Sequence, residues 1–184
     1  MRQAMLAGAA LLALAAGPTT AGEALTGQPV ILDGDTLTLR GRVVGLQGIA
    51  APGLRQTCLD RRGRGYRCGQ RSAEALARYL GGAAIACDAG GTDPSGRLLA
   101  TCRLGGTDIA GWLASEGHAV ADRQAGGAYL AEERLAWARR RGLWAGAFDD
   151  PTQRQRHPYA ASGQVAAAGR GEAGAPGLAP PRRP

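Results

Sequence analysis

Short apolar runs alternate with glycine and charged residues in the first part of the chain. Val30–Leu32, Leu37–Leu39 and Val43–Ile49 are rich in leucine and β-branched residues, which favours strands. The segment from Arg40 to Arg42 separates the second run from the third and is typical of a hairpin tip. We therefore expect a meandering sheet to open the domain.

Apolar residues recur at helical spacing further along the chain. Gln70–Leu80 shows this spacing, and Gly81 with Gly82 ends it. Asp108 stands where it can cap a short helix that closes at Gly117. The order of strands, helix, strands and helices predicts an α+β, mainly β domain.

A longer helix is expected over Tyr129–Arg141, followed by Gly142. Its core face is predicted to combine Ala131, Leu135 and Ala138, with the basic residues in solvent. The tryptophans are expected to belong to the core more than to a stacking platform: Trp112, Trp137 and Trp144.

Four cysteines allow three disulfide pairings. The turn sequence from Asp93 to Gly96 predicts a hairpin between Ile85–Cys87 and Leu98–Leu104. If Asp93 faces Gly96, counting outward by equal steps brings Cys87 opposite Cys102. Local geometry then favours pairing Cys58 with Cys68. A zinc site is disfavoured, because the chain has no Cys-x-x-Cys pair and its two histidines lie far away in sequence.

Composition divides the 184 residues into three parts. Residues 1–24 combine an early arginine, a short apolar run and small residues, as a secretory signal peptide does. The run is shorter than the ~20 residues that span a bilayer, so we expect no membrane anchor after cleavage. Residues 25–160 form the predicted domain. The Gly-, Ala-, Pro- and Arg-rich stretch 161–184 is expected to be a disordered tail.

All basic residues are arginine, and the formal net charge is +7. Codon bias explains most of this preference, but the charge permits anionic partners such as nucleic acid. The cysteines and the export signal predict a periplasmic or extracellular location. The oligomeric state is not predicted.

Five segments together carry a resemblance to a known family. They are "DGDT" at 33–36, "LQGIAAP" at 46–52, "CGQRSAEAL" at 68–76, "DPSGRLLATC" at 93–102 and "RRRGLWAG" at 139–146. In this order the chain resembles staphylococcal-nuclease-like, or thermonuclease-like, domains over residues 30–148. More narrowly it is similar to the exported bacterial branch with two short-range cysteine pairs.

The resemblance implies a five-stranded OB-fold barrel packed with about three helices, and calcium-dependent hydrolysis of DNA and RNA in active members. Asp35 then matches a metal carboxylate, with Asp33 beside it as an outer acid on the same side of an extended chain. Arg97 matches a catalytic arginine facing phosphate. Ala51 can offer only its backbone carbonyl to the metal. The alternatives are a strand-edge turn for the two acids and a solvated charge for Arg97.

Three side chains of the family's working set are replaced in this chain. Gly45 occupies the position of a catalytic arginine, Ala50 that of a metal-binding aspartate and Gly53 that of the catalytic glutamate. Arg55 and Asp60 lie close enough in sequence to be considered as substitutes. Arg123 stands where a substrate-binding tyrosine is expected, with Tyr129 nearby.

Two functions follow from this pattern of kept and lost residues. The first is a catalytically degenerate nuclease that binds nucleic acid or an unidentified protein partner. The second is an active calcium-dependent phosphodiesterase with rearranged catalytic residues. The loss of an arginine, a base and a metal ligand favours the first, because each such group contributes about 10²-fold or more to the rate. Two carboxylates alone would also hold calcium weakly.

Overall fold

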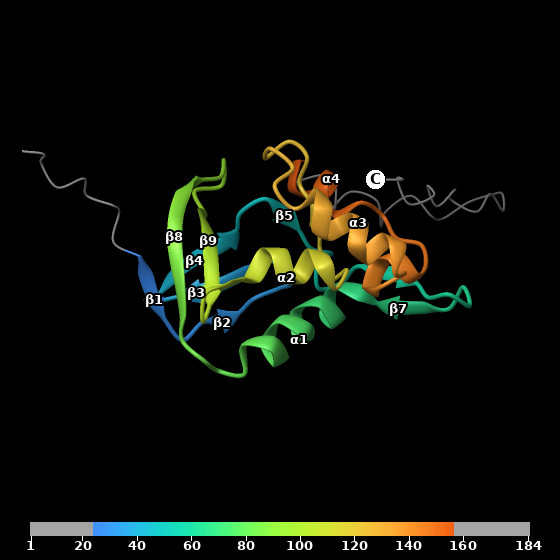
Figure 1. The fold of residues 1–184 in the computed structure, drawn as a ribbon, viewed down its shortest axis with the longest axis horizontal. Coiled ribbons are helices and arrows are strands. Elements are labelled where there is room, and N and C mark those ends of the chain that lie inside the picture. The colour runs from blue at the N-terminus through green and yellow to red at the C-terminus, as the bar shows by residue number, and fades with distance from the viewer. Residues whose placement is uncertain (1–23, 157–184) are drawn as a thin grey trace, which may run out of the picture.

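The computed structural model describes residues 24–156 (Figure 1). The predicted tail and the predicted signal peptide, except for Ala24, lie outside the described residues and stay predictions. Within residues 24–156, every helix is too short or too polar to span a bilayer.

The largest sheet has seven strands, and its pairs are antiparallel with one exception. The order across the sheet is β1 (Leu25–Gly27), β8 (Ile85–Thr92), β9 (Leu98–Leu104), β4 (Arg42–Leu46), β3 (Thr36–Leu39) and β2 (Val30–Ile31), with β10 (Thr107–Asp108) on β9. The exception is the parallel pair β4–β9, in which Gly45 lies opposite Leu99. This pair brings Arg97, just before β9, beside the residues of β4.

Two smaller sheets complete the strands of the described region. β5 (Ile49–Ala50) pairs with β11 (Val120–Ala121), and β6 (Thr57–Leu59) pairs with β7 (Gly65–Arg67). Figure 1 shows the β6–β7 hairpin extending away from the main sheet, beyond the end of α1 (Cys68–Leu80). The sequence pattern did not predict this hairpin, because its strands have three residues each and the loop between them is rich in arginine.

The helices of the described region are α1, α2 (Ile109–Ser115), α3 (Leu130–Ala138), the 3₁₀ helix η1 (Gly142–Ala145) and α4 (Pro151–Arg156). The first three confirm the predicted helices. Gly81 ends α1 in the left-handed conformation, and Asp108 caps α2 by accepting the Gly111 N–H at 3.0 Å. The sequence analysis did not predict α4.

The predicted core face of α3 was wrong. Leu135 is 40% exposed and Trp137 is 39% exposed, whereas Glu133 and Ala136 are fully buried. The apolar pattern misled because a buried carboxylate occupies the face toward β11, where it is bonded to the backbone N–H of Ala121. The prediction for Trp144 is confirmed, since it is 8% exposed and packs edge-on against Phe148.

Two apolar clusters form the interior. The larger joins the main sheet to α1 and α2 through residues such as Leu37, Val44, Leu76, Ile109 and Leu113. The smaller lies around the β5–β11 pair, α3 and η1, and contains Ala50, Val120, Ala136, Leu143, Trp144 and Phe148 with the Cys58–Cys68 disulfide. The chain is thus an α+β protein built mainly from sheet, as predicted. Hydrogen bonding leaves the main sheet open in the described residues, so the closed five-stranded barrel stays a prediction.

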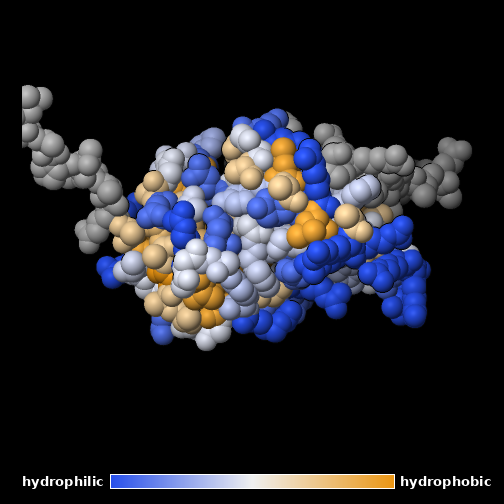
Figure 2. Space-filling view, in the orientation of Figure 1, coloured by the Kyte–Doolittle hydropathy of each residue, from blue (hydrophilic) through white to orange (hydrophobic). Residues whose placement is uncertain are grey.

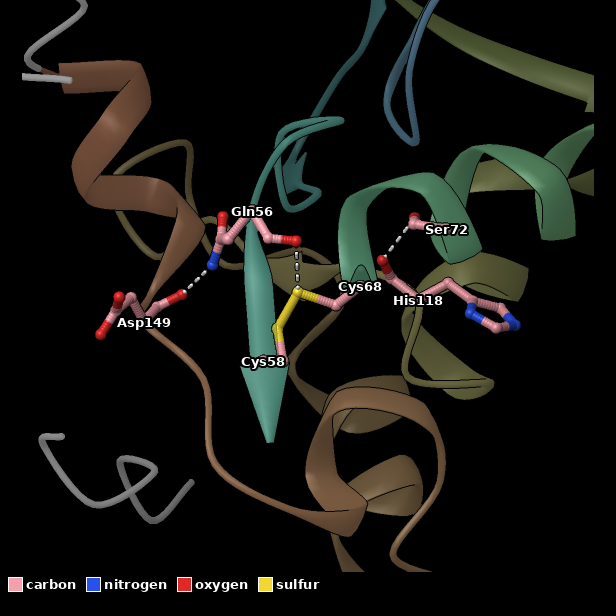
Figure 3. Close-up of a disulfide and its surroundings, with 6 residues drawn as sticks. All are labelled: Gln56, Cys58, Cys68, Ser72, His118 and Asp149. Atoms are coloured by element: carbon pink, nitrogen blue, oxygen red, sulfur yellow. Dashed lines mark hydrogen bonds between the residues drawn. A yellow bond between two sulfur atoms is a disulfide. The ribbon is translucent and has the colours of Figure 1, made fainter. Parts of the chain in front are cut away.

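Both predicted disulfides form in the structure. Cys58–Cys68 ties β6 to the first residue of α1 (Figure 3), and Cys87–Cys102 joins β8 to β9. The pairing of β8 with β9 and the turn from Asp93 to Gly96 were predicted correctly, since the Gly96 N–H donates to the Asp93 carbonyl at 2.9 Å, but the facing partner of Asp93 was not. Asp93 faces Arg97, not Gly96, because its N–H donates to the Arg97 carbonyl at 2.9 Å. A bulge between Ala89 and Gly91 takes up the extra residue, so the two cysteines still meet.

Candidate functional site

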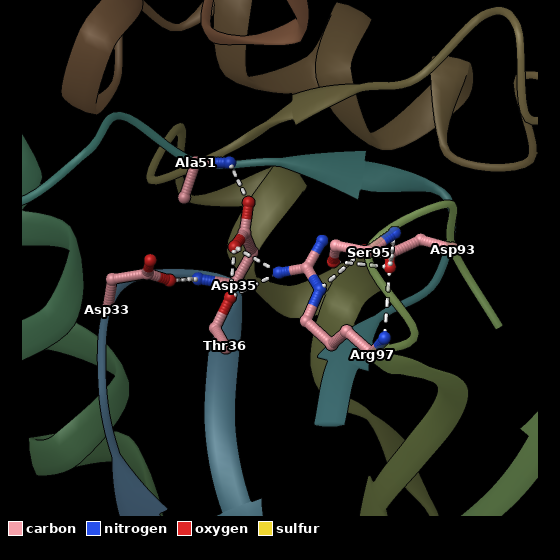
Figure 4. A network of polar contacts seen from close by, with 7 residues as sticks. All are labelled: Asp33, Asp35, Thr36, Ala51, Asp93, Ser95 and Arg97. Carbon is pink, nitrogen blue, oxygen red and sulfur yellow. Dashed lines mark hydrogen bonds and ion pairs between the residues drawn. The ribbon is translucent and has the colours of Figure 1, made fainter. Parts of the chain in front are cut away.

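Asp33 and Asp35 lie just before β3, but the chain between them bends. The expected extended segment was wrong, because Asp33 closes a local turn. Its Oδ1 accepts a hydrogen bond from the Asp35 N–H at 3.0 Å (Figure 4). A side chain at Gly34 would place its Cβ 2.1 Å from Ser72 Oγ, so α1 packs directly on this turn. Asp33 is half-buried, while Asp35 is 3% exposed.

Both oxygens of the Asp35 carboxylate accept hydrogen bonds from protein donors. Thr36 Oγ1 donates to Oδ1 at 2.8 Å, and the Ala51 N–H donates to Oδ2 at 2.6 Å (Figure 4). Burial and, after it, the charge of Asp33 raise the pKa of Asp35 to about 7, although the hydrogen bond from the Ala51 N–H opposes the increase. Asp35 is therefore only partly charged at neutral pH.

Arg97 reaches across from the β8–β9 turn into the same network. Its Nη1 donates to Thr36 Oγ1 at 2.5 Å and lies 3.8 Å from Asp35 Oδ1. Its Nε donates to Asp93 Oδ2 at 2.9 Å. Burial alone would raise the pKa of Asp93, but hydrogen bonds from Ser95 and Arg97 outweigh it, so this pKa lies below its usual value. Asp93 thus stays charged and neutralises Arg97.

The absence of a side chain at position 45 makes this position of Arg97 possible. Gly45 faces Thr36 across the β3–β4 pair. A Cβ at Gly45 would lie 2.8 Å from Arg97 Cζ and 2.9 Å from its Nε. The guanidinium of Arg97 therefore occupies the space in which a side chain at position 45 would begin.

The other two replaced positions are built into the packing. Ala50 is fully buried and belongs to the smaller apolar cluster. The carbonyl of Gly53 accepts the Gln56 N–H at 2.7 Å. A Cβ at Gly69 would lie 1.7 Å from the same carbonyl oxygen, so this loop packs tightly against the start of α1. Neither position supplies an acid to the site.

The groups around Asp35 do not form a ligand set that fits calcium. This ion takes six to eight oxygen ligands, several of them from carboxylates. In the described residues no group of three or more His, Cys, Asp or Glu side chains is placed to hold a metal. Asp35 accepts N–H and O–H donors, and a guanidinium lies 3.8 Å away. For Ala51, the structure shows its N–H bonded to Asp35.

Arg55 and Asp60, which were considered as substitutes for the missing side chains, do not join the Asp35 network in this structure. Asp60 accepts a hydrogen bond from Arg64 Nε at 2.9 Å and two backbone N–H groups of its own loop. Arg55 is exposed.

The residues expected near a substrate-binding position have partners within the protein. Arg123 pairs with Glu133 at 2.6 Å, and Tyr129 donates its hydroxyl to Asp108 at 2.9 Å. Burial and this hydrogen bond raise the pKa of Tyr129, so both side chains serve the fold.

The sequence analysis missed one buried polar group, Glu133, which is fully buried on α3. His118 follows the end of α2 and is half-buried. Burial, with Arg78 and Arg71 adding positive charge, lowers the pKa of His118 to about 4. Its carbonyl accepts the hydroxyl of Ser72 at 2.7 Å (Figure 3).

Comparison with known proteins gives one curated relative of clear similarity. It is the succinoglycan biosynthesis protein ExoI of Rhizobium meliloti (strain 1021), which is 39% identical over 127 residues. The match covers 67% of this chain and 66% of the relative, slightly less than two thirds of its length. No protein-family model matches the chain.

Proposed function

We propose that this chain is an exported thermonuclease-like protein that has lost nuclease catalysis and acts as a binding module for nucleic acid or a protein partner. The open sheet is then a variant of the five-stranded OB barrel. The ordered motifs from residues 33 to 146 support this family, and the α+β architecture is compatible with it.

The position of Arg97 over Gly45 is the observation that carries this proposal. An active phosphodiesterase needs cations that are free to meet the phosphate and an acid that is free to hold a metal or a water. Here Arg97 is bonded to Asp93 and Thr36, and Asp35 accepts two protein donors. The charges of the site are compensated internally, which supports a role without catalysis.

The two disulfides support an oxidising compartment. We infer that the protein works in the periplasm or outside the cell. The name of the relative concerns succinoglycan biosynthesis and is neutral between nuclease chemistry and binding.

One observation favours the second candidate, an active calcium-dependent nuclease. Arg97 comes from a distant part of the chain and meets the neighbouring residues Asp35 and Thr36 in one hydrogen-bonded network. This is the arrangement that a partly retained active site would keep, so activity has to be measured.

The test is to incubate the full mature protein with single-stranded DNA, in calcium and in chelator, and to follow cleavage and binding separately. We expect binding, measured by fluorescence anisotropy, without calcium-dependent cleavage. Calcium-dependent cleavage that disappears in both Asp35→Asn and Arg97→Ala would overturn the proposal. Cleavage that persists in both variants would indicate a contaminating nuclease, and failure to bind DNA would leave a protein as the partner.

A further inference from the structure

A second charged region lies away from the Asp35 network, between the β6–β7 hairpin, α1 and η1. A hollow of about 400 Å³ opens there to solvent. Its walls include Asp60, Tyr66 and Gly142 together with four arginines: Arg61, Arg62, Arg64 and Arg71. We call this region the basic hollow. Figure 2 shows hydrophilic residues gathered where Figure 1 places β7.

Most of the positive charge in the basic hollow is not neutralised by the protein. Asp60 is its one acid, and it forms an ion pair with Arg64 at 2.8 Å. Among the described residues, no carboxylate lies within ion-pair distance of Arg61, Arg62 or Arg71. Three arginines without an acid partner therefore line one concave space.

Two of these arginines are also positioned by neighbours that leave them charged. The Arg71 guanidinium lies over the ring of Tyr66, 5.4 Å from its centroid. Arg61 donates to the carbonyl of Arg140 at 3.2 Å, which leaves its other N–H groups available. Arg71 also contributes to the lowered pKa of His118, after burial and Arg78. Positive potential thus extends from the hollow to the histidine behind it.

We propose that the basic hollow is a binding site for a compact polyanion of the diphosphate class. Its volume lies within the range of ordinary small-molecule sites, about 300–1,000 Å³. Three uncompensated cations call for a ligand that carries about three negative charges in a small space. The arginines reach the hollow from the β6–β7 loop and from α1, so they approach a ligand from different directions. A tetrahedral phosphate group offers oxygens in several directions, whereas a carboxylate offers two in one plane.

This site is separate from the Asp35 network and needs no catalysis. A ligand held there would leave Asp35 and Arg97 unchanged. The result of the nuclease test therefore does not decide whether the basic hollow binds a diphosphate.

The test is isothermal titration calorimetry of the full mature protein with inorganic pyrophosphate, without divalent metal. Binding is expected to weaken at least tenfold in Arg62→Ala/Arg71→Ala. The matched control is Arg42→Ala/Arg134→Ala, which removes the same charge from two exposed arginines that do not line the hollow. The control should bind as the wild type does. Thermal unfolding of each variant verifies that these surface changes leave the fold intact.

Three further probes define the ligand class. If uridine diphosphate binds as tightly as pyrophosphate, the site recognises diphosphate esters. If only pyrophosphate binds, the ligand is the free diphosphate anion. Both outcomes support the proposal. Citrate that binds as tightly would overturn the phosphate class. Oligothymidine that binds through Arg62 and Arg71 when pyrophosphate does not would make the surface a site for a polymer. An equal loss of pyrophosphate affinity in the control variant would show that only net charge matters, and it would overturn the proposed site.

Discussion

The Asp35 network and the basic hollow use the same residue type in opposite ways. Arg97 is 22% exposed in its side chain and is bonded to an acid and a hydroxyl of its own protein. Arg62 and Arg71 are exposed and have no acid partner among the described residues. A charge compensated inside the fold stabilises structure, whereas an uncompensated charge around a hollow is available to a ligand. The family resemblance points to the first region, and the electrostatics point to the second.

The largest expected effect concerns the pH dependence of stability. The Asp35 pKa is raised from 3.8 to about 7, so between these values the folded chain binds more protons than the unfolded one. Asp35 therefore lowers the free energy of unfolding as pH rises through this window. The His118 pKa is lowered from 6.5 to about 4, so His118 raises the free energy of unfolding as pH rises between those values. We expect the two slopes to oppose each other in the wild type.

Single variants separate the two slopes. Asp35→Asn should leave a stability that rises with pH, and His118→Gln should leave one that falls, by up to roughly 4 kcal/mol across the window. Urea denaturation at several values from pH 4 to 7 measures both. A uniform loss of stability in a variant does not change its slope. Parallel profiles in all three proteins would contradict the raised pKa of Asp35 and the lowered pKa of His118.

The disulfides allow the two regions to be loosened one at a time. Removing Cys58–Cys68 or Cys87–Cys102 should each cost about 3 kcal/mol in the chain-entropy model, since they close separations of 10 and 15 residues. The first bond holds the hairpin of the basic hollow. Cys58→Ala/Cys68→Ala should therefore also weaken pyrophosphate binding several-fold, while Cys87→Ala/Cys102→Ala should not. Equal binding by both folded variants would show that the hairpin does not shape the site.

Arg97→Ala should destabilise the protein by about 2 kcal/mol, because it leaves Asp93 and Thr36 without a shared partner beside a buried acid. The matched control is Arg103→Ala, which removes an ion pair with Asp88 whose side chains are 43% and 58% exposed. That change should cost less than about 0.5 kcal/mol. Equal costs, measured by urea denaturation, would show that the Asp35 network contributes no more than a surface ion pair.

The smallest expected effect is at Gly45. Gly45→Ala should cost about 1 kcal/mol, because the new Cβ displaces the Arg97 guanidinium from Thr36. In the Arg97→Ala background the same change should be neutral or stabilising, since alanine suits a strand better than glycine does. A double-mutant cycle on unfolding free energies measures the difference. Additive costs would mean that Gly45 and Arg97 do not compete for the same space.

Local patterns were sufficient for much of the fold. The end of α1 at Gly81, the cap at Asp108 and both cysteine pairs were predictable, because each depends on residues close in sequence. The hairpin register shows the limit of such reasoning. The turn from Asp93 to Gly96 forms, but Asp93 faces Arg97, one residue further than expected. The bulge near Gly90 restores the register, so Cys87 and Cys102 still lie opposite each other.

The sequence by itself determined which residues this protein has at the candidate site: Asp33, Asp35 and Arg97 present, with Gly45, Ala50 and Gly53 where acids and a cation are expected. Only the tertiary structure decided what the remaining residues do. Arg97 occupies the space over Gly45, Glu133 is buried beneath β11, and the arginines of the β6–β7 hairpin share a hollow with Arg71. These arrangements join residues far apart in the chain, and their energies depend on burial and on neighbouring charges. Neither quantity can be obtained from local spacing.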